Sequence, residues 1–442
     1  MEVLLKRQLF VFLLEGKTGV LFVPHRGAVL MSIITGLDIG TTKVACLVGE
    51  LDQHRRLRVI GVGIAPSRGI KKGVIVNVEA ATEAIFEAVD KAERTAGVEI
   101  REAYVGVAGS HISALNSRGT VAINHPNHYI EKYDVRRVLE AARAIAIPYS
   151  QEVIHVVPRG YWLDGSNGVI DPVGLHGYRL EVEAHIVTAG MMALQTYEKC
   201  CEAVGVSTRS FVLEPLASGE AVLNEDEKEL GVVLVDIGGG TTDISIFLEG
   251  AVWHTVSLPV GGSHFSHDLA VGLQCPLPVA EEIKKRYGHA FVTDITDHEP
   301  LDISHFGDGP LRTVTRRDVA SILEHRVVDI FDLIADEIKH SGYEGLLPAG
   351  LVLCGGSSQL AGFKEAGRDY FDAPVRVATP QNITGLADVL RNPGYATSVG
   401  LLSWGIHHDH PQGLLPRTTM SANRSTLWKS RLRTWLAALL PG

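Results

Sequence analysis

The sequence has few of the features that mark disulfide-bonded, membrane-spanning or nucleic-acid-binding proteins. Its five cysteines are odd in number and form no Cys-x-x-Cys pair, which argues against a disulfide framework and a zinc site. No apolar run approaches the roughly 18 residues that a transmembrane helix needs. The formal net charge is −10, whereas a general nucleic-acid binder normally has a basic surface. These absences favour a globular protein of a reducing compartment without nucleic acid as a partner. The cysteines are Cys46, Cys200, Cys201, Cys275 and Cys354.

The length of 442 residues exceeds what one hydrophobic core usually supports, so two domains are expected. Hydrophobic residues make up 45% and charged residues 21%, which is ordinary for a globular protein. Near the start, Lys6 and Arg7 precede an apolar run that is too short for a signal peptide and lacks a nearby cleavage site. We expect Met31 to be the true start and residues 1–30 to lie outside the fold.

Two similar stretches, residues 36–45 and residues 234–246, organise the rest of the sequence. In each, apolar β-formers run into an aspartate, Asp38 or Asp236, then glycines and threonines follow and alternating apolar residues resume. This pattern predicts a strand, a tight turn and an antiparallel strand. It differs from a P-loop and from a dinucleotide-binding loop, because in both of those the glycines open a helix.

The predicted turns suit a polyphosphate. Their glycines leave backbone N–H groups accessible to an anion, their threonine hydroxyls can donate hydrogen bonds, and the neighbouring aspartates can hold Mg²⁺ through water. One copy alone is equally consistent with an ordinary glycine-rich hairpin. Two copies separated by the length of a domain favour a nucleotide cleft between duplicated halves.

Helical and strand periodicities alternate along the rest of the chain. Residues 214–221, with Pro215 in the first turn, predict a helix between the domains. Residues 351–354 predict a buried strand, after which Gly355 and Gly356 open a helix whose N-terminus suits an anion or a nucleotide sugar. Further helices are predicted at residues 80–96, 133–145, 193–204, 280–288 and 318–339.

The order of these motifs resembles the FtsA family of actin-like bacterial cell-division proteins, within the superfamily of actin, DnaK-type chaperones and sugar kinases. Besides the two hairpins, the resemblance rests on residues 72–75, 174–181, 354–360 and 382–386, and it extends from Met31 to the end of the chain. It implies an α/β, actin-like ATPase fold: two duplicated domains around a nucleotide cleft, with an inserted subdomain. The implied divisions are an N-terminal extension (1–30), subdomain 1A (31–78, 158–224 with the interdomain helix, and 379–404), an inserted SHS2-like subdomain 1C (79–157), subdomain 2A (225–263 and 337–378), subdomain 2B (264–336), a flexible linker (405–424) and an amphipathic membrane-targeting helix (425–440).

The resemblance also assigns residues to ATP and Mg²⁺. It places Asp38 and Asp236 near the Mg²⁺, which they would hold through water because that ion dehydrates reluctantly. Glu214 matches a carboxylate that helps to place the hydrolytic water in the chaperones, which makes Glu214 and Asp236 the candidate catalytic residues. The small-subdomain lysine of the chaperones has no counterpart, so at most weak ATPase activity is expected. Without the resemblance, the charges at residues 281–285 would be interpreted as a solvated helix face. The implied ATP-binding residues are Gly40, Thr41, Thr42, Lys43, Gly238, Gly239, Gly240, Thr241, Thr242, Glu281, Lys284, Lys285, Gly355, Gly356 and Ser357.

The C-terminal segment differs in composition from the rest of the chain. From residue 405 a polar stretch rich in histidine and proline is typical of a flexible linker. Within residues 425–440, apolar side chains recur on one face of a predicted helix, and cations flank that face. A helix docked on its own domain would not need this local excess of positive charge, whereas an anionic membrane surface attracts it. The predicted membrane-contacting residues are Trp428, Lys429, Arg431, Leu432, Arg433, Trp435, Leu436 and Leu439.

We therefore expect an ATP-binding adaptor that anchors FtsZ filaments to the cytoplasmic side of the cell membrane at the division site. The resemblance implies that subdomain 2B binds the FtsZ C-terminal tail, that subdomain 1C binds later division proteins, and that the protein assembles into actin-like filaments. Three alternatives remain open. A small-molecule kinase would need a catalytic aspartate outside the hairpins, and a chaperone ATPase would need a peptide-binding domain after Trp404. A pilus-assembly relative would share the cleft and the insert, but would not be expected to end in an amphipathic helix.

Overall fold

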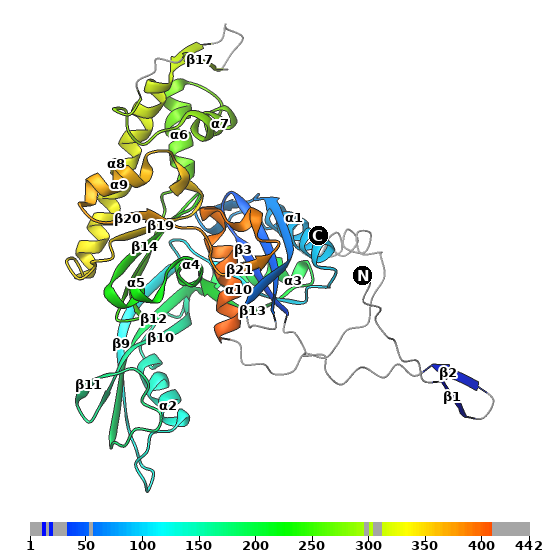
Figure 1. The fold of residues 1–442 in the computed structure, drawn as a ribbon, viewed down its shortest axis with the longest axis vertical. Coiled ribbons are helices and arrows are strands. Elements are labelled where there is room, and N and C mark those ends of the chain that lie inside the picture. Colours follow the sequence, from blue (N-terminus) through cyan, green and yellow to red (C-terminus); the bar gives the residue numbers. More distant parts are fainter. Residues whose placement is uncertain are drawn as a thin grey trace, which may run out of the picture.

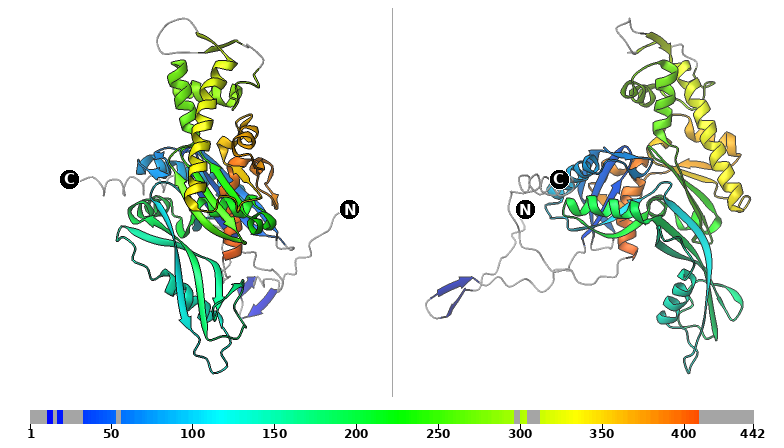
Figure 2. Two further views of the ribbon diagram at one scale, coloured as in Figure 1. Left: turned by 90° about the vertical axis from the view of Figure 1, so that its left-hand side faces the viewer. Right: turned by 180° about the vertical axis from the view of Figure 1, so that it is seen from behind.

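The computed structural model describes residues 11–14, 17–20, 33–52, 56–295, 300–303 and 312–408. Two sheets form the middle of an elongated molecule, with a helical end built from residues 262–341 and a smaller sheet from residues 112–190 at the other end (Figures 1 and 2). Within these described residues, no helix is long and apolar enough to cross a bilayer. The predicted membrane-targeting helix and most of residues 1–30 lie outside the described residues. The described part of residues 1–30 is an antiparallel pair, β1 (Val11–Leu14) and β2 (Lys17–Val20).

The first predicted hairpin lies in the middle of a six-stranded sheet. Strands β3 and β4 pair antiparallel, with Asp38 opposite Ala45, as the alternating pattern predicted. The strand order in this sheet is β13-β8-β3-β4-β5-β21. The bounds are β3 (Ile33–Ile39), β4 (Lys43–Leu51), β5 (Leu57–Pro66), β8 (Glu102–Val107), β13 (Ser207–Leu213) and β21 (Ile383–Gly385).

The second predicted hairpin lies in a five-stranded sheet with the same plan. Strands β14 and β15 pair antiparallel, with Asp236 opposite Asp243, and the order is β16-β15-β14-β19-β20. In both sheets an antiparallel meander of three strands is followed by two parallel strands on the side of its first strand. This repeat confirms the prediction of duplicated halves. The bounds are β14 (Val232–Ile237), β15 (Thr242–Leu248), β16 (Ala251–Leu258), β19 (Leu351–Cys354) and β20 (Val375–Val377).

Helix α1 (Val78–Ala96) packs against the six-stranded sheet. The Asn77 side chain accepts a hydrogen bond from the Ala80 N–H, and Gly97 ends the helix at a φ of 70°. A β-carbon on Gly63 of β5 would lie 1.9 Å from the Ala88 carbonyl oxygen, so the helix and the strand are in backbone contact. The sheet also packs on α3 (Met191–Ala203) through a core in which Cys46, Cys200 and Cys201 are buried. All five cysteines are buried and free.

The inserted subdomain begins and ends later than the predicted residues 79–157. Its sheet has the order β11-β10-β12-β9, and helix α2 covers one face with Val138 and Ala142 buried against it. Helix α1 belongs to the first half, as shown above, whereas β12 pairs with β9 and β10 over its full length. An alternating strand pattern does not reveal which sheet a strand joins, which explains the wrong boundary. The bounds are β9 (Ile112–Ala122), α2 (Lys132–Arg143), β10 (Gln151–Leu163), β11 (Ser166–Val169) and β12 (Arg179–Gly190).

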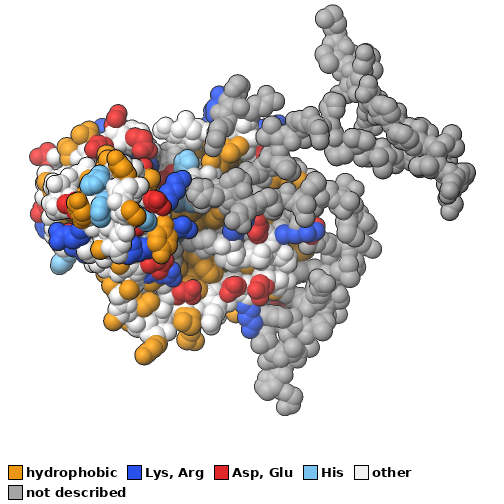
Figure 3. Space-filling view, turned by 90° about the horizontal axis from the view of Figure 1, so that it is seen from below, with side chains coloured by type: hydrophobic (Ala, Val, Ile, Leu, Met, Phe, Trp, Pro, Cys, Tyr) orange, Lys and Arg blue, Asp and Glu red, His pale blue; other side chains and the backbone are white. Residues whose placement is uncertain are grey.

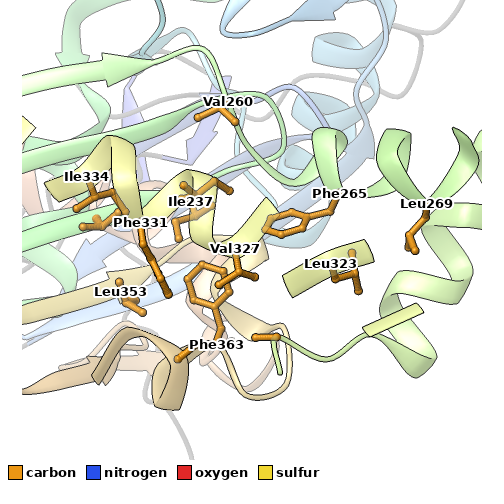
Figure 4. Packing of buried hydrophobic residues seen from close by; sticks show 14 of the residues in the cluster. Ile237, Val260, Phe265, Leu269, Leu323, Val327, Phe331, Ile334, Leu353 and Phe363 are labelled. Carbon is orange, nitrogen blue, oxygen red and sulfur yellow. The ribbon is translucent and has the colours of Figure 1, made fainter. Parts of the chain in front are cut away.

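The helical end packs on the five-stranded sheet through a core rich in phenylalanine. Phe265 of α6, Phe331 of α8 and Phe363 of α9 lie together, with ring centroids 6.4 Å apart for the pair Phe265 and Phe363 and 5.0 Å apart for Phe331 and Phe363 (Figure 4). Thr315 caps α8, since its hydroxyl accepts from the Asp318 N–H. The bounds are α6 (Gly262–Leu273), α7 (Leu277–Tyr287), β17 (Pro300–Ile303), β18 (Arg312–Thr315), α8 (Arg316–Ser341) and α9 (Phe363–Phe371).

Two helices cross between the halves. Helix α4 (Glu214–Val222) is the predicted interdomain helix, with Pro215 in its first turn, and it packs against α10 (Ala396–His408). The predicted linker therefore begins too early, because residues 405–408 are helical. Gly405 fits closely between Ile34 and Tyr104, and the His408 ring stacks on Trp404 with centroids 3.7 Å apart. Helix α5 (Glu225–Leu230) follows α4.

The helix predicted to open at Gly355 is a single 3-10 turn, η1 (Gly356–Gln359), and α9 begins later. Gly355 has a φ of 83°, a left-handed conformation that breaks the approach to a helix. A second 3-10 turn, η3 (Pro393–Tyr395), leads directly into α10. A short hairpin of β6 (Ile70–Lys71) and β7 (Val74–Ile75) connects β5 to α1.

Candidate functional site

A cavity of about 950 Å³ lies between the halves of the molecule. Both glycine-rich turns, the start of α4, helix α7 and the turns η1 and η3 contribute to its walls. Among the residues predicted to bind ATP or Mg²⁺ or to act in catalysis, Gly240 and Thr242 do not line it. The predicted residues that do are Asp38, Gly40, Thr41, Thr42, Lys43, Glu214, Asp236, Gly238, Gly239, Thr241, Glu281, Lys284, Lys285, Gly355, Gly356 and Ser357.

The two glycine-rich turns have the same backbone geometry and touch each other. The Gly40 N–H donates to the Lys43 carbonyl oxygen at 3.0 Å, and the Gly238 N–H donates to the Thr241 carbonyl oxygen at 2.9 Å. A β-carbon on Gly239 would lie 2.3 Å from the methyl carbon of Thr42. The close approach of the two turns therefore requires glycine at position 239.

Two predicted phosphate-binding residues lie behind the turn. The Thr242 hydroxyl is buried and donates to the Val260 carbonyl oxygen at 2.9 Å, so it holds the segment that follows β16. A β-carbon on Gly240 would lie 2.6 Å from the Thr41 hydroxyl oxygen. These positions keep the turn in place, whereas Gly238, Gly239 and Thr241 face the cavity.

Buried carboxylates gather at the inner end of the cavity. Burial raises the pKa of Asp38, although Lys43 and a hydrogen bond from Ser398 act in the opposite direction. Burial, followed by the charge of Asp38, raises the pKa of Glu214 well above its ordinary value. Burial also raises the pKa of Asp243 to about 7. Asp243, at the end of the second Gly-Thr motif, is not among the predicted site residues, and it lies behind the cavity lining.

Lys43 brings a positive charge to these carboxylates and connects them to the C-terminal part of the fold. Its ammonium group donates to the Gly394 carbonyl oxygen and lies 4.8 Å from the centre of the Tyr395 ring. Gly394, Tyr395 and Thr397 line the cavity, and the sequence reasoning missed all three. They are far from the hairpins in sequence and carry no recognisable motif.

The charged residues of α7 form the opposite wall. The Lys284 ammonium lies 2.7 Å from a Glu281 carboxylate oxygen and donates to the Gly262 carbonyl oxygen at 3.0 Å. Burial alone would raise the pKa of Glu281, but hydrogen bonds from Lys284 and Ser266 hold it below its ordinary value. Only 15% of the Lys284 side chain is exposed, so this is not the solvated helix face of the alternative interpretation. Lys285, at the rim, is 69% exposed.

Comparisons with known proteins identify the family. Residues 233–400 match the family model described as cell division protein FtsA, and residues 109–188 match the model of the SHS2 domain inserted in FtsA. The cell division protein FtsA of Pseudomonas aeruginosa is 46% identical over 374 residues, which cover 85% of this chain and 89% of that protein. The chain belongs to the FtsA family. It is thus a cell-division protein, and the SHS2 match agrees with the insert boundaries in the structure.

Other FtsA proteins match over similar lengths. FtsA of Bacillus subtilis is 37% identical, with 86% of this chain and 85% of that protein covered. FtsA of Escherichia coli is 35% identical, with 91% of this chain and 97% of that protein covered. The predicted membership of the FtsA family is therefore confirmed across most of the chain.

Solved structures confirm the actin-like fold. A chain of the PilM-PilN type IV pilus biogenesis complex superposes with a TM-score of 0.61 at 16% identity, covering 84% of this chain and 98% of that chain. MreB5 of Spiroplasma citri, solved with ADP, superposes with a TM-score of 0.51 at 14% identity, covering 85% of this chain and 99% of that chain. At these identities the likeness concerns the fold alone, so it does not favour the pilus alternative.

Proposed function

We propose that this FtsA-family protein binds ATP with Mg²⁺ in the cleft, and that the nucleotide state controls its assembly into actin-like filaments. The observation that carries the proposal is the cavity between the halves, where two equivalent glycine-rich turns, one from each half, meet and both contribute to the wall. Their backbone N–H groups would hold the phosphates, with Lys43 as the cation. The ADP bound to the MreB5 structure is consistent with this assignment.

The donor groups at the inner end of the cleft fit Mg²⁺. Asp38 and Asp236 are carboxylates on opposite halves, both nearly buried, and Mg²⁺ favours a few carboxylates together with water and phosphate oxygens. Bound Mg²⁺ would neutralise charge on the phosphates. We assign Asp38 and Asp236 to hold it through water, with Asp236 also near the reacting phosphate.

The environment of Glu214 supports at most slow hydrolysis. Its pKa is raised because the carboxyl is buried beside Asp38, so it holds its proton to a higher pH than an ordinary glutamate. A protonated carboxyl is a poor general base. Glu281, Lys284 and Lys285 on one side, with Gly355, Gly356 and Ser357 on the other, would enclose the adenosine.

Titration with a fluorescent ATP analogue tests nucleotide binding. Lys43→Ala removes the cation of the first turn. We expect this change to weaken ATP binding about ten- to a hundredfold, because a hydrogen bond to a charged group usually contributes that much to affinity. Lys339→Ala, on the exposed side of α8 and outside the cavity lining, is the matched control and should bind normally. Equal affinities for the wild type and Lys43→Ala would contradict this assignment of the phosphate site.

We further assign the protein to the membrane adaptor role of anchoring FtsZ filaments at the division site, peripherally on the cytoplasmic side. The support is the amphipathic and basic pattern of residues 425–440. The test is co-sedimentation with anionic liposomes in the presence of ATP, comparing the full chain with a chain that ends at Asn423. We expect only the full chain to pellet, and less of it at high salt. Both chains remaining in the supernatant would count against the membrane role.

Two surfaces are assigned to protein partners. Residues 264–336, subdomain 2B, would bind the FtsZ C-terminal tail, and the insert would bind later division proteins. Large apolar side chains are exposed on the insert, and the His176 ring contacts those of Tyr129 and Tyr178. Figure 3 views the molecule from the end that carries the insert, where apolar and histidine side chains appear together. The exposed residues include Tyr129, Tyr133, Ile170, Val173, Leu175 and Tyr178.

Binding measurements can separate these two surfaces. A labelled FtsZ tail peptide should bind the full chain, and Tyr178→Ala in the insert should leave that affinity unchanged. The same Tyr178→Ala change should weaken capture of a later division protein. Loss of FtsZ peptide binding in Tyr178→Ala, with the melting temperature unchanged, would contradict the assignment of FtsZ to subdomain 2B.

A further inference from the structure

The first turn of α10 carries two neighbouring hydroxyl groups that reach the aspartates of different halves. The Ser398 hydroxyl donates to Asp38 Oδ2 at 2.5 Å, and the Thr397 hydroxyl donates to Asp236 Oδ2 at 3.0 Å. Asp38 lies next to the end of β3 in the six-stranded sheet, and Asp236 lies next to the end of β14 in the five-stranded sheet. One turn of helix thus contacts both halves of the cleft at their carboxylates.

Helix α4 adds a third hydroxyl to this arrangement. The Ser218 hydroxyl donates to Asp236 Oδ2 at 2.6 Å and lies 3.0 Å from the Thr397 hydroxyl. All three hydroxyl side chains are buried, with Thr397 the most exposed at 7%. A hydrogen bond from a hydroxyl to a carboxylate is stronger than one between two neutral groups. These three side chains therefore have little freedom to rotate.

The helices that carry the hydroxyls cannot easily shift relative to each other. A β-carbon on Gly400 of α10 would lie 1.8 Å from the Ala217 carbonyl oxygen of α4, so the two backbones are in contact. Thr397 and Ser398 are also consecutive residues, whose α-carbons are about 3.8 Å apart in any trans peptide. The backbone therefore fixes the distance between the two hydroxyl donors.

The direction of these hydrogen bonds matters for the cleft. All three hydroxyls bond to the Oδ2 atoms, while Asp236 Oδ1 lies on another side, where a β-carbon on Gly355 would be 2.4 Å from it. Gly355, Asp38, Asp236 and Thr397 all line the cavity. The helix hydroxyls thus hold each carboxyl group by one oxygen and so set the orientation of the other.

We infer that Thr397 and Ser398 are positioning residues, which orient Asp38 and Asp236 for one Mg²⁺-nucleotide. Ser218 supports Thr397 in this role. The inference rests on the proposed binding of Mg²⁺ and ATP. Without the hydroxyls, the two carboxyl groups would be free to rotate away from the orientation that the metal needs. This rotation would weaken the Mg²⁺-dependent part of nucleotide affinity and leave the contacts to the adenosine in place.

The experiment measures the affinity of the full chain for a fluorescent ATP analogue, once with Mg²⁺ and once with EDTA. Thr397→Val keeps the shape of the side chain and removes its hydroxyl, and Ser398→Ala removes the other. We expect each to weaken binding about five- to tenfold in Mg²⁺, the usual worth of one hydrogen bond, and less than about twofold in EDTA. Thr397→Ser retains the hydroxyl and should restore wild-type affinity.

Ser403→Ala is the matched control on the same helix, because its hydroxyl bonds only weakly to the Val399 carbonyl oxygen at 3.5 Å. It should leave both affinities unchanged. Equal losses of affinity with Mg²⁺ and with EDTA, together with a lower melting temperature, would show that Thr397 and Ser398 stabilise the fold and do not position the carboxylates. If Thr397→Val does not fold, Ser398→Ala and Ser218→Ala provide the same comparison. A wild-type protein that binds no nucleotide overturns the proposed function as well, whereas normal Mg²⁺ dependence in folded variants overturns the positioning role alone.

Discussion

At the scale of single residues, burial changes the pH at which Asp243 titrates. It is buried on β15 opposite Asp236, and its Oδ1 atom is among the buried oxygens without a hydrogen-bond partner in the described residues. Burial raises its pKa from 3.8 to about 7. The folded protein therefore keeps a proton on Asp243 through a pH range in which the unfolded chain has released it.

This proton makes stability depend on pH. The contribution of Asp243 is fully present below the unfolded pKa of 3.8 and is lost as the pH rises toward the folded pKa of about 7. Asn cannot ionise, so Asp243→Asn should lose less unfolding free energy between pH 5 and pH 8 than the wild type. Urea unfolding of the nucleotide-free proteins at pH 5 and pH 8 measures this change in unfolding free energy. Asp369→Asn, on the exposed side of α9, is the control and should behave like the wild type. A parallel pH dependence in Asp243→Asn and the wild type would contradict the raised pKa.

The candidate site was partly predictable at this scale. The hairpin residues from Asp38 to Lys43, and those around Asp236, carry a local motif, so the sequence alone predicted that they share a site. Thr397, Ser398 and Tyr395 carry none, because they reach the cleft through the packing of α10. The hydroxyl of Thr242 instead bonds inside the fold, to the carbonyl oxygen of Val260 just beyond β16, and the local motif does not reveal that contact.

At the scale of elements, the insert is joined to the second half through Arg159 of β10. Its guanidinium lies 3.8 Å from the centre of the Trp253 ring on β16 and forms an ion pair with Glu183 at 3.2 Å. It also donates to the Tyr343 hydroxyl at 3.2 Å, beyond the end of α8. Only 5% of the Arg159 side chain is exposed, so these interactions are formed largely out of water.

Arg159→Ala should destabilise the protein by about 2–3 kcal/mol, because it removes a desolvated cation–π contact and hydrogen bonds to a charged group. Arg118→Ala is a matched control: Arg118 pairs with the same Glu183, but 72% of its side chain is exposed. Such surface pairs contribute about 0–1 kcal/mol. Unfolding in urea measures both, and equal losses in the two variants would show that burial adds nothing to the Arg159 contacts.

The sequence predicted the positions of helices and strands better than it predicted which sheet each strand joins. Both hairpins and the helices α1, α2, α3, α4, α7 and α8 agree with their periodicity to within a few residues. The membership of β12 was wrong because a half-buried strand alternates in the same way in either sheet. The helix expected at Gly355 failed because a left-handed glycine and the later Gly362, with a φ of 76°, delay helix formation until Phe363.

At the scale of the whole molecule, a ligand in the cleft would bind both halves at once and should stabilise them together. At a nucleotide concentration of about 100 times the dissociation constant, binding adds about 2.7 kcal/mol to the free energy of unfolding. We therefore expect ATP with Mg²⁺ to raise the melting temperature by several degrees in scanning calorimetry. Lys43→Ala at the same nucleotide concentration should show a smaller rise. An equal rise in both proteins would mean that the stabilisation comes from a site other than this cleft.

Strand β12 runs without interruption from the free end of the insert to Gly190, where α3 begins in the first half. At about 3.3 Å per residue, its 12 residues span about 40 Å. Because the strand is this long, a rotation of the insert by a few degrees about Gly190 would displace its far end by several ångströms. A small change of angle at the body of the protein would thus become a large displacement of the surface that carries Tyr178.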